Sequence, residues 1–313
     1  IDCIFEATYL IIKRKTHMKI KKIVKGRIIL GNHHEDYIAY KKRGKLALFN
    51  LEDLSEIQTT YKIGLFVYFN DDWNIAILAS ENNDVYKLDL KDFSAEKITK
   101  KLRLPLVNPI CFTSKYICFH EAYSNELVIY EYLTKETEYH HLKDYHIYSI
   151  HEYDEERFIV TYLEKNKYIQ KLGLIRISDF SISEIDFNQE NINAYRSIQC
   201  IQELNMLIFL TKSKLMVLSK DLKSILKEIK ISDYCKDEHE EFNSYTYNKY
   251  IQKILYCIKD KLYYLDLKDM SINFIDNIIP TNFLAYSHKN KTLAINSIVD
   301  GEYTDKIVIY DLY

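Results

Sequence analysis

One eleven-residue phrase recurs along the chain and limits the possible fold more than any other feature. KLYYLDLKDMS at 261–271 nearly repeats DVYKLDLKDFS at 84–94. The other relatives are KLALFNLEDLS (45–55), ELVIYEYLTKE (126–136), KLGLIRISDFS (171–181), KLMVLSKDLKS (214–224) and KIVIYDLY (306–313). Their first apolar residues follow one another at intervals of 39, 42, 45, 43, 47 and 45 residues. Seven units of similar length therefore account for almost the whole sequence after Met18.

Each unit has the same internal pattern. In residues 65–102, the runs LFVYFN, IAILAS, VYKLDL and AEKITKKL are separated by short polar turns. Four short strands per unit, repeated about every 40–45 residues, is the period of a β-propeller blade. The fourth run is rich in charge, as expected of an outer edge strand protected by lysine. We therefore predict an all-β, seven-bladed β-propeller with four antiparallel strands per blade.

The two ends of the chain are predicted to meet. The last unit stops at Tyr313, directly after its third strand, whereas KIKKIVK at 19–25 has the composition of a fourth strand. We expect this segment to complete the seventh blade and close the ring. Residues 18–313 then form a single propeller domain, and residues 1–17 are interpreted as an upstream extension or read-through, since Met18 resembles a natural start.

An aspartate recurs in the turn after the third strand. Asp53, Asp92, Asp179 and Asp269 each precede an apolar residue and a serine. An aspartate side chain accepts hydrogen bonds from backbone N–H groups two residues on, which forms an Asx turn. We interpret these aspartates as turn formers, with a metal role as the alternative.

Composition narrows the classes of partner. The net charge is −2, with 43 basic and 45 acidic residues, so the chain lacks the overall positive charge of a nucleic-acid binder. The six cysteines form no CxxC pair, and most lie in apolar runs, which indicates reduced core thiols and a cytoplasmic location. No run of about 18 apolar residues would cross a membrane. We expect no cofactor, no metal, no membrane binding and a monomer.

In architecture the pattern resembles the seven-bladed propellers of the WD40-like and YVTN-like class. The WD40 hallmarks, Gly-His early and Trp-Asp after the third strand, are absent, and the third strand ends instead in Leu-Asp-Leu at 88–90 and 265–267. Asp-box repeats are absent too, and one Trp and six Gly could not supply them. The resemblance therefore implies a fold and no catalytic residue.

In such propellers, the loops from strand four to the next strand one and from strand two to strand three share one face. The resemblance implies that partners bind on this face, around the central channel. The residues that we place there as a candidate partner-binding face are Asn108, Tyr123, Tyr145, His146, Tyr195, Arg196 and Tyr245.

Two polar segments are alternative candidates for a functional site. YHHLKDYHIYSIHEY at 139–153 carries four histidines, His140, His141, His146 and His151, which we interpret as surface or core residues, with a metal site and partner binding as the alternatives. Neighbouring residues of a strand point to opposite faces, so His140 and His141 cannot both face one metal ion. SDYCKDEHEEF at 232–242 carries five carboxylates, which we interpret as a solvated acidic loop. Recognition of a basic partner and general acid–base chemistry are the alternatives for that loop.

We therefore predict a non-enzymatic protein- or peptide-binding scaffold. The alternatives are a carbohydrate-active or other small-substrate enzyme, or a ligand sensor, with a site at the channel mouth. No set of residues with catalytic spacing favours the enzyme.

Overall fold

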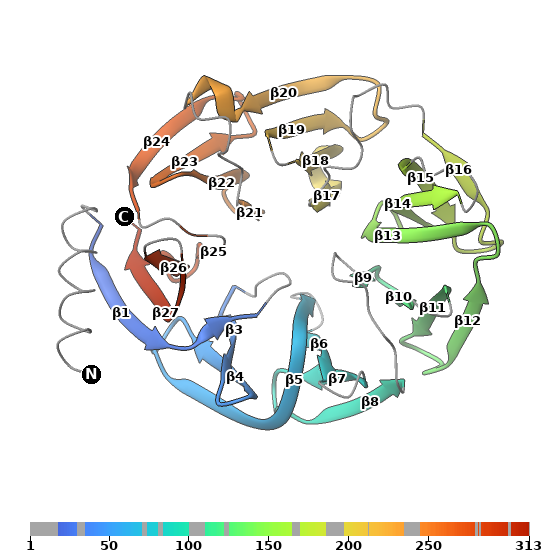
Figure 1. Cartoon of the computed structure of the whole chain (residues 1–313), viewed down its shortest axis with the longest axis horizontal. Helices are drawn as coiled ribbons and strands as arrows, with labels where there is room; N and C mark the ends of the chain where they lie inside the picture. Colours follow the sequence, from blue (N-terminus) through green and yellow to red (C-terminus); the bar gives the residue numbers. More distant parts are fainter. Residues whose placement is uncertain are drawn as a thin grey trace. The chain divides into compact units, whose positions relative to one another are not determined.

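The structure is a computed structural model. It describes residues 18–29, 35–70, 74–80, 84–99, 110–121, 125–164, 170–185, 197–211, 213–234, 245–278, 281, 283–299 and 302–312. Two compact units divide these residues: the first draws on residues up to 81, 89–94 and those from 231 on, and the second on 82–88 and 95–230. Figure 1 shows the strands of both units, coloured along the sequence.

The first unit holds the strands from both ends of the chain. They are β1 (Ile20–Lys25), β2 (Arg27–Ile28), β3 (Tyr37–Lys42), β4 (Lys45–Asn50), β5 (Glu56–Asn70), β6 (Ile75–Ser80), β21 (Tyr245–Asn248), β22 (Lys253–Ile258), β23 (Lys261–Asp266), β24 (Ile272–Asn277), β25 (Leu284–Ser287), β26 (Thr292–Val299) and β27 (Glu302–Asp311). A short 3₁₀ helix, η4, covers Ile231–Asp233.

The second unit holds the middle of the chain. Its elements are β7 (Val85–Asp89), β8 (Ala95–Thr99), β9 (Ile110–Phe112), β10 (Tyr116–Glu121), β11 (Glu126–Glu131), β12 (Thr137–His141), β13 (Tyr145–Glu152), β14 (Arg157–Glu164), β15 (Gln170–Arg176), β16 (Ile182–Glu184), β17 (Ser197–Ile201), η3 (Gln202–Leu204), β18 (Met206–Leu210), β19 (Lys214–Ser219) and β20 (Ile225–Lys230).

These strands form seven four-stranded antiparallel blades, which confirms the predicted architecture. Blades three to six follow chain order as β9–β12, β13–β16, β17–β20 and β21–β24. Blades one and two are β2–β5 and β5–β8, because β5 is one long strand that serves both. The sequence pattern treated the two halves of β5 as separate strands. Its register shifts between Ile63 and Val67, and no proline interrupts the run.

The seventh blade confirms the predicted closure by the N-terminal strand. Its strand order is β1-β27-β26-β25, so β1 supplies the fourth strand that the C-terminus lacks. Val24 lies opposite Ile307 in the β1–β27 ladder. Two backbone groups extend the closure, since Asp311 N–H donates to the Lys19 carbonyl at 2.9 Å and Met18 N–H donates to Asp276 Oδ2 at 2.7 Å.

Strands that are apolar on both faces build the core between successive blades. In the first unit, Leu255 and Leu262 of blade six pack with Leu293 and Val308 of blade seven. In the second unit, Cys118 of blade three packs with buried residues of blade four. A sheet covered on both faces needs such continuous apolar runs, and β4, β14 and β22 each bury four or five successive residues.

The predicted Asx turns are present after the third strand. The serine N–H groups donate to the aspartate Oδ1 atoms at 2.8–3.0 Å in all four turns: Asp53–Ser55, Asp92–Ser94, Asp179–Ser181 and Asp269–Ser271. The pKa of each aspartate is lowered, because hydrogen bonds from the serine side chain and then from the serine backbone N–H favour the ionised form. The aspartates are turn formers, as predicted.

Phe93 and Phe180, the apolar residues inside two of these turns, contact the preceding blade. Leu54, Phe93, Phe180 and Met270 have φ between 55° and 61°, in the left-handed region that side chains seldom adopt. Phe93 packs edge-on against Tyr37 at 6.3 Å, and Phe180 stacks on His140 at 3.4 Å between ring centroids. The contact with the preceding blade offsets a backbone conformation that costs about 1–2 kcal/mol.

Candidate functional site

The described chain brings together two of the predicted face residues. Tyr145 and His146 begin β13, directly after the turn that joins blades three and four. Tyr245 begins β21 in the other unit, half-buried and opposite Tyr256. The four other predicted residues lie outside the described residues: Asn108, Tyr123, Tyr195 and Arg196.

A β-bulge interrupts β13 just after these two residues. Ile147 lies opposite Tyr162 and Ser149 lies opposite Thr161, so Tyr148 is an extra residue without a cross-strand partner position. Tyr148 is 41% exposed, although the residues on either side of it are buried. Bulges commonly re-aim a side chain next to a functional site. Here the bulge displays an aromatic ring on the first strand of blade four.

Three rings lie in a row at this bulge. The His146 ring packs edge-on against Tyr148 at 5.2 Å between centroids and against His120 at 5.6 Å. His120 comes from β10 of blade three, where it is fully buried. We call His120, Asn125, Tyr145, His146 and Tyr148 the His120 site.

Asn125 fixes the orientation of this site. It closes the β10–β11 turn with φ 55° and is itself buried. Its Nδ2 group donates to the backbone carbonyls of Leu142 and Tyr145. Asn125 therefore ties the turn between strands two and three of blade three to the connection into blade four, the two kinds of loop predicted to share a face.

The same amide determines which His120 nitrogen carries the proton. Because both Nδ2 hydrogens of Asn125 are used, its Oδ1 faces His120 Nε2 at 3.2 Å, and Nε2 must donate. Nδ1 then holds a lone pair, and it is buried with no hydrogen-bond partner among the described atoms. Burial lowers the pKa of His120 to about 4, so the ring is neutral at pH 7.

Tyr145 is held from behind by aromatic packing. Its ring meets Tyr162 edge-on at 5.4 Å. The Tyr162 ring in turn lies over Gly173, where an added Cβ would approach a ring carbon to 2.8 Å. Glycine at 173 thus leaves the space that Tyr162 needs to support Tyr145.

The other histidines of the 139–153 segment do not join this site in a metal-binding group. His140 stacks on Phe180 and lies 3.1 Å from Glu138, and His141 is exposed. His151 is buried, and burial lowers its pKa to about 3. Among the residues that the structure describes, no three His, Cys, Asp or Glu side chains are arranged to hold a metal ion.

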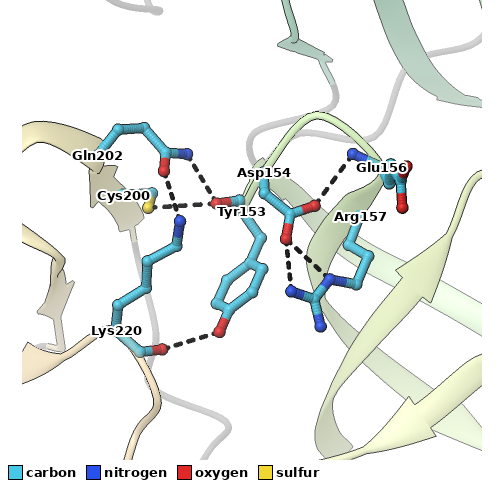
Figure 2. A network of polar contacts seen from close by, with 7 residues as sticks. All are labelled: Tyr153, Asp154, Glu156, Arg157, Cys200, Gln202 and Lys220. Carbon is cyan, nitrogen blue, oxygen red and sulfur yellow. Dashed lines mark hydrogen bonds and ion pairs between the residues drawn. The ribbon is translucent and has the colours of Figure 1, made fainter.

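A second polar cluster joins blades four and five, and sequence reasoning missed it (Figure 2). The Tyr153 carbonyl accepts from Gln202 Nε2 at 2.7 Å, and the Tyr153 hydroxyl donates to the Lys220 carbonyl at 3.0 Å. Lys220 Nζ donates to Gln202 Oε1 at 2.5 Å, and Asp154 pairs with Arg157. These polar groups form hydrogen bonds with one another, so the cluster links blade four to blade five.

Sequence reasoning also missed His120, Asn125 and Tyr148. The available signal was FHE at 119–121, where polar residues end an apolar strand that otherwise continues the core. No sequence signal marked the bulge at Tyr148.

Comparison with known proteins supports the fold alone. No family model matches the sequence, and no curated protein matches it either. A chain in the crystal structure of the mitotic checkpoint complex is similar, with a TM-score of 0.66 and 9% identity over 95% of this chain and 96% of that chain. The crystal structure of the C-terminal WD40 domain of Sif2 is also similar, with a TM-score of 0.59 and 11% identity over 95% of this chain and 99% of that chain. The chain has a WD40-like propeller fold.

The described residues contain no helix long and apolar enough to cross a membrane.

Proposed function

We propose that the chain is a non-enzymatic scaffold that binds a protein or peptide through the loop face that carries the His120 site. The observation behind this proposal is the bulge that exposes Tyr148 beside His146. A rigid ring with a polar tip gives a large contact area at low entropic cost, and tyrosine is enriched at protein interfaces. Asn125 supports this display by fixing the loops around it.

The fold gives independent support for a protein partner. One similar structure belongs to a multiprotein assembly, the mitotic checkpoint complex. That assembly is a property of the other protein. For this chain it supports protein binding as the class of function to test first.

We also propose that the protein acts as a cytoplasmic monomer. Cys111 and Cys118 lie opposite each other across β9 and β10, both buried and both free thiols. Reduced thiols this close together fit a reducing compartment. The protein is purified, denatured without a reductant and alkylated. Both cysteines should be modified, and a disulfide between them would contradict the cytoplasmic location.

Affinity capture with the full chain tests the binding face. The test variant carries Tyr145→Ala, His146→Ala and Arg196→Ala, and a second variant carries Tyr148→Ala alone. Tyr250→Ala is the matched control, because Tyr250 is 59% exposed and lies in a turn of the other unit. Partners that the wild type and the control capture should be lost from both test variants. If all variants capture the same partners with the same yield, the chosen face is wrong.

A further inference from the structure

The turn between β3 and β4 concentrates positive charge. It joins strands two and three of blade one, which makes it one of the turns predicted to lie on the partner-binding face, and it reads KKRGK at 41–45. Arg43 and Lys45 are exposed, as is Lys62 in the adjoining strand β5. No ion pair joins these three side chains to a carboxylate among the described residues. We call Arg43, Lys45 and Lys62 the basic tip.

Glu56 does not neutralise the basic tip, because its carboxylate is already occupied. Lys42 Nζ lies 2.6 Å from both carboxylate oxygens of Glu56. The Tyr40 hydroxyl donates to Oε2 and the Gln58 amide donates to Oε1, each at 2.5 Å. The three cations of the basic tip therefore remain available to a ligand.

The tip holds an arginine in a backbone conformation that arginine seldom adopts. Arg43 has φ 51° and Gly44 has φ 79°, and two positive values are the mark of a type I′ hairpin turn. Asparagine, aspartate or glycine usually occupies the first of these positions, because a larger side chain is strained there. Arg43 therefore adds a charge at a position where a small, neutral residue would be more stable.

A β-bulge in β5 brings Lys62 to the tip. The register further along the β4–β5 ladder would place Thr60 opposite Lys45. Instead three residues of β5 face Leu46 alone, and Lys62 lies opposite Lys45. Thr59 fixes the bulge, because its hydroxyl donates to the Leu46 carbonyl at 2.9 Å. The bulge thus replaces a neutral side chain by a cation beside Lys45.

The result is a row of like charges across three strands. Lys42 lies opposite Lys45 in the β3–β4 ladder, and Lys45 lies opposite Lys62 in the β4–β5 ladder. Residues directly opposite each other project from the same face of a sheet, with Cβ atoms about 4.5–5.5 Å apart, and like charges so placed repel each other. Glu56 offsets the charge of Lys42. An anionic ligand at Lys45 and Lys62 would remove the repulsion that is left.

The equivalent hairpin of blade six lacks this row. Its tip is Lys259-Asp260, which carries no net charge, and Lys261 lies opposite Asn277 instead of a second cation. Lys259 also has a positive φ, of 55°. The two hairpins therefore share a strained residue at the tip, whereas the row of cations belongs to blade one.

We propose that the basic tip binds an acidic segment of a protein partner. The Arg43 guanidinium suits a carboxylate bound by two parallel hydrogen bonds, and Lys45 and Lys62 supply point charges for neighbouring carboxylates. A nucleic acid suits the tip less, because the chain has a net charge of −2 and three cations on one hairpin are a small footprint for a phosphate backbone. The inference goes beyond the proposed function, since the basic tip shares no residue with the His120 site.

Differential selection of random peptides displayed on phage is the first part of the test. Phage that bind the triple variant Arg43→Gln, Lys45→Gln and Lys62→Gln are removed first, which also removes peptides that bind through the His120 site. The remaining phage are selected on the immobilised wild-type full chain. The selected peptides should contain clustered aspartate or glutamate residues. A labelled synthetic copy of the most frequent peptide is the probe in fluorescence anisotropy.

Two changes assign the binding to charge at the tip. The triple variant should bind the probe at least about tenfold more weakly, because each exposed ion pair contributes up to about fivefold in affinity. A probe in which glutamine and asparagine replace the acidic residues should lose as much. Lys261→Gln is the matched control and should bind like the wild type, since it removes an exposed lysine at the equivalent position of the blade-six hairpin.

Thermal unfolding separates binding from a structural role of the cations. Lys62→Gln removes one of two facing cations, so it should melt at or slightly above the wild-type temperature while it binds the probe more weakly. A structural role for Lys62 predicts a lower melting temperature for this variant instead, and that result would count against the proposal.

Three further results would overturn the basic tip as a site for acidic peptides. In the first, selection yields no peptide that distinguishes the wild type from the triple variant. In the second, the distinguishing peptides lack acidic residues. In the third, a single-stranded RNA with as many charges as the probe binds more tightly than the probe and is equally weakened by the triple variant. None of these results bears on partners captured through the His120 site, which the triple variant leaves unchanged.

Discussion

The turns after the third strand and the His120 site solve opposite problems. In the turns, Asp53, Asp92, Asp179 and Asp269 repeat one hydrogen-bond pattern, and each aspartate is exposed and satisfied. In the His120 site, a buried imidazole keeps an acceptor without a donor among the described atoms. A polar group has little effect on stability in the exposed turns, whereas the polar nitrogen buried in the His120 site is destabilising.

Function in a repeat fold should be sought where the repeat is interrupted. A feature that recurs in blade after blade serves the geometry that the blades share. A destabilising feature that departs from the repeat, such as the bulge at Tyr148 beside a buried histidine, contributes nothing to the geometry that the blades share. Proteins commonly break local rules at functional sites and compensate elsewhere.

The largest expected effect concerns the geometry of the repeat. Deletion of residues 1–25 removes β1, which exposes the edge of β27 and the buried Ile307 and Ile309. We expect the melting temperature to fall by about 10 °C or more, or cooperative unfolding to be lost, by differential scanning calorimetry. Lys25→Ala, at an exposed position of the same strand, is the control and should melt like the wild type. A deletion variant that melts with the wild type would refute closure by β1.

The next largest expected effect is a loss of stability at low pH that comes from the buried histidines. His120 and His151 have folded pKa values of about 4 and about 3, below the ordinary value near 6.5, because burial disfavours their charged forms. The unfolded chain therefore binds more protons below pH 6.5, and stability must fall as pH drops from 6.5 toward the folded values. When the pH is lowered from 7 to 5, the free energy of unfolding should fall by about 2 kcal/mol for each of the two rings.

Urea unfolding at the two pH values measures this loss. His151→Gln should remove about half of the loss assigned to the two rings, while His141→Gln, at an exposed position, should remove none. Equal pH dependence in the wild type and in both variants would show that the buried His151 ring does not stay neutral.

Asn125→Ala tests the cost of the site directly. It leaves the carbonyls of Leu142 and Tyr145 and the Nε2 donor of His120 without their partner. We expect a loss of about 3 kcal/mol in the free energy of unfolding, since buried unsatisfied groups cost about 1–3 kcal/mol each. Asn205→Ala is the matched control, because Asn205 also has a left-handed backbone, with φ 51°, but is not buried. Similar losses in both variants would mean that only backbone conformation matters.

The smallest effect belongs to a single turn. Asp269→Ala removes one Asx bond, and its carboxylate lies on the surface. We expect a small loss in the free energy of unfolding by chemical denaturation, smaller than that of Asn125→Ala, because solvent replaces the lost hydrogen bond at an exposed turn. Asp92→Ala should lose the same amount, because the two turns share one geometry. A large difference between them would show that the turns are not equivalent.

Most of the fold could be predicted because it is local and repeated. The Asx turns need only an aspartate two residues before a serine, and the closing strand follows from a count of strands in the last unit. The continuity of β5 was missed because two adjacent runs in sequence do not reveal whether the chain turns between them.

The site was only partly predictable. Tyr145 and His146 follow from their place in a loop between blades. His120 and Asn125 contribute through contacts with the next blade, and periodicity carries no information on such contacts. The bulge at Tyr148 depends on a register shift that the alternation of β13 does not reveal.

One paired measurement tests the division between geometry and function most directly. Tyr148→Ala and Asp269→Ala are compared for the free energy of unfolding and for affinity to the same captured partner. We expect Tyr148→Ala to lose affinity about tenfold or more while its stability is kept. We expect Asp269→Ala to lose stability and to keep its affinity. Wild-type affinity in Tyr148→Ala, or lost affinity in a folded Asp269→Ala, would contradict this expectation.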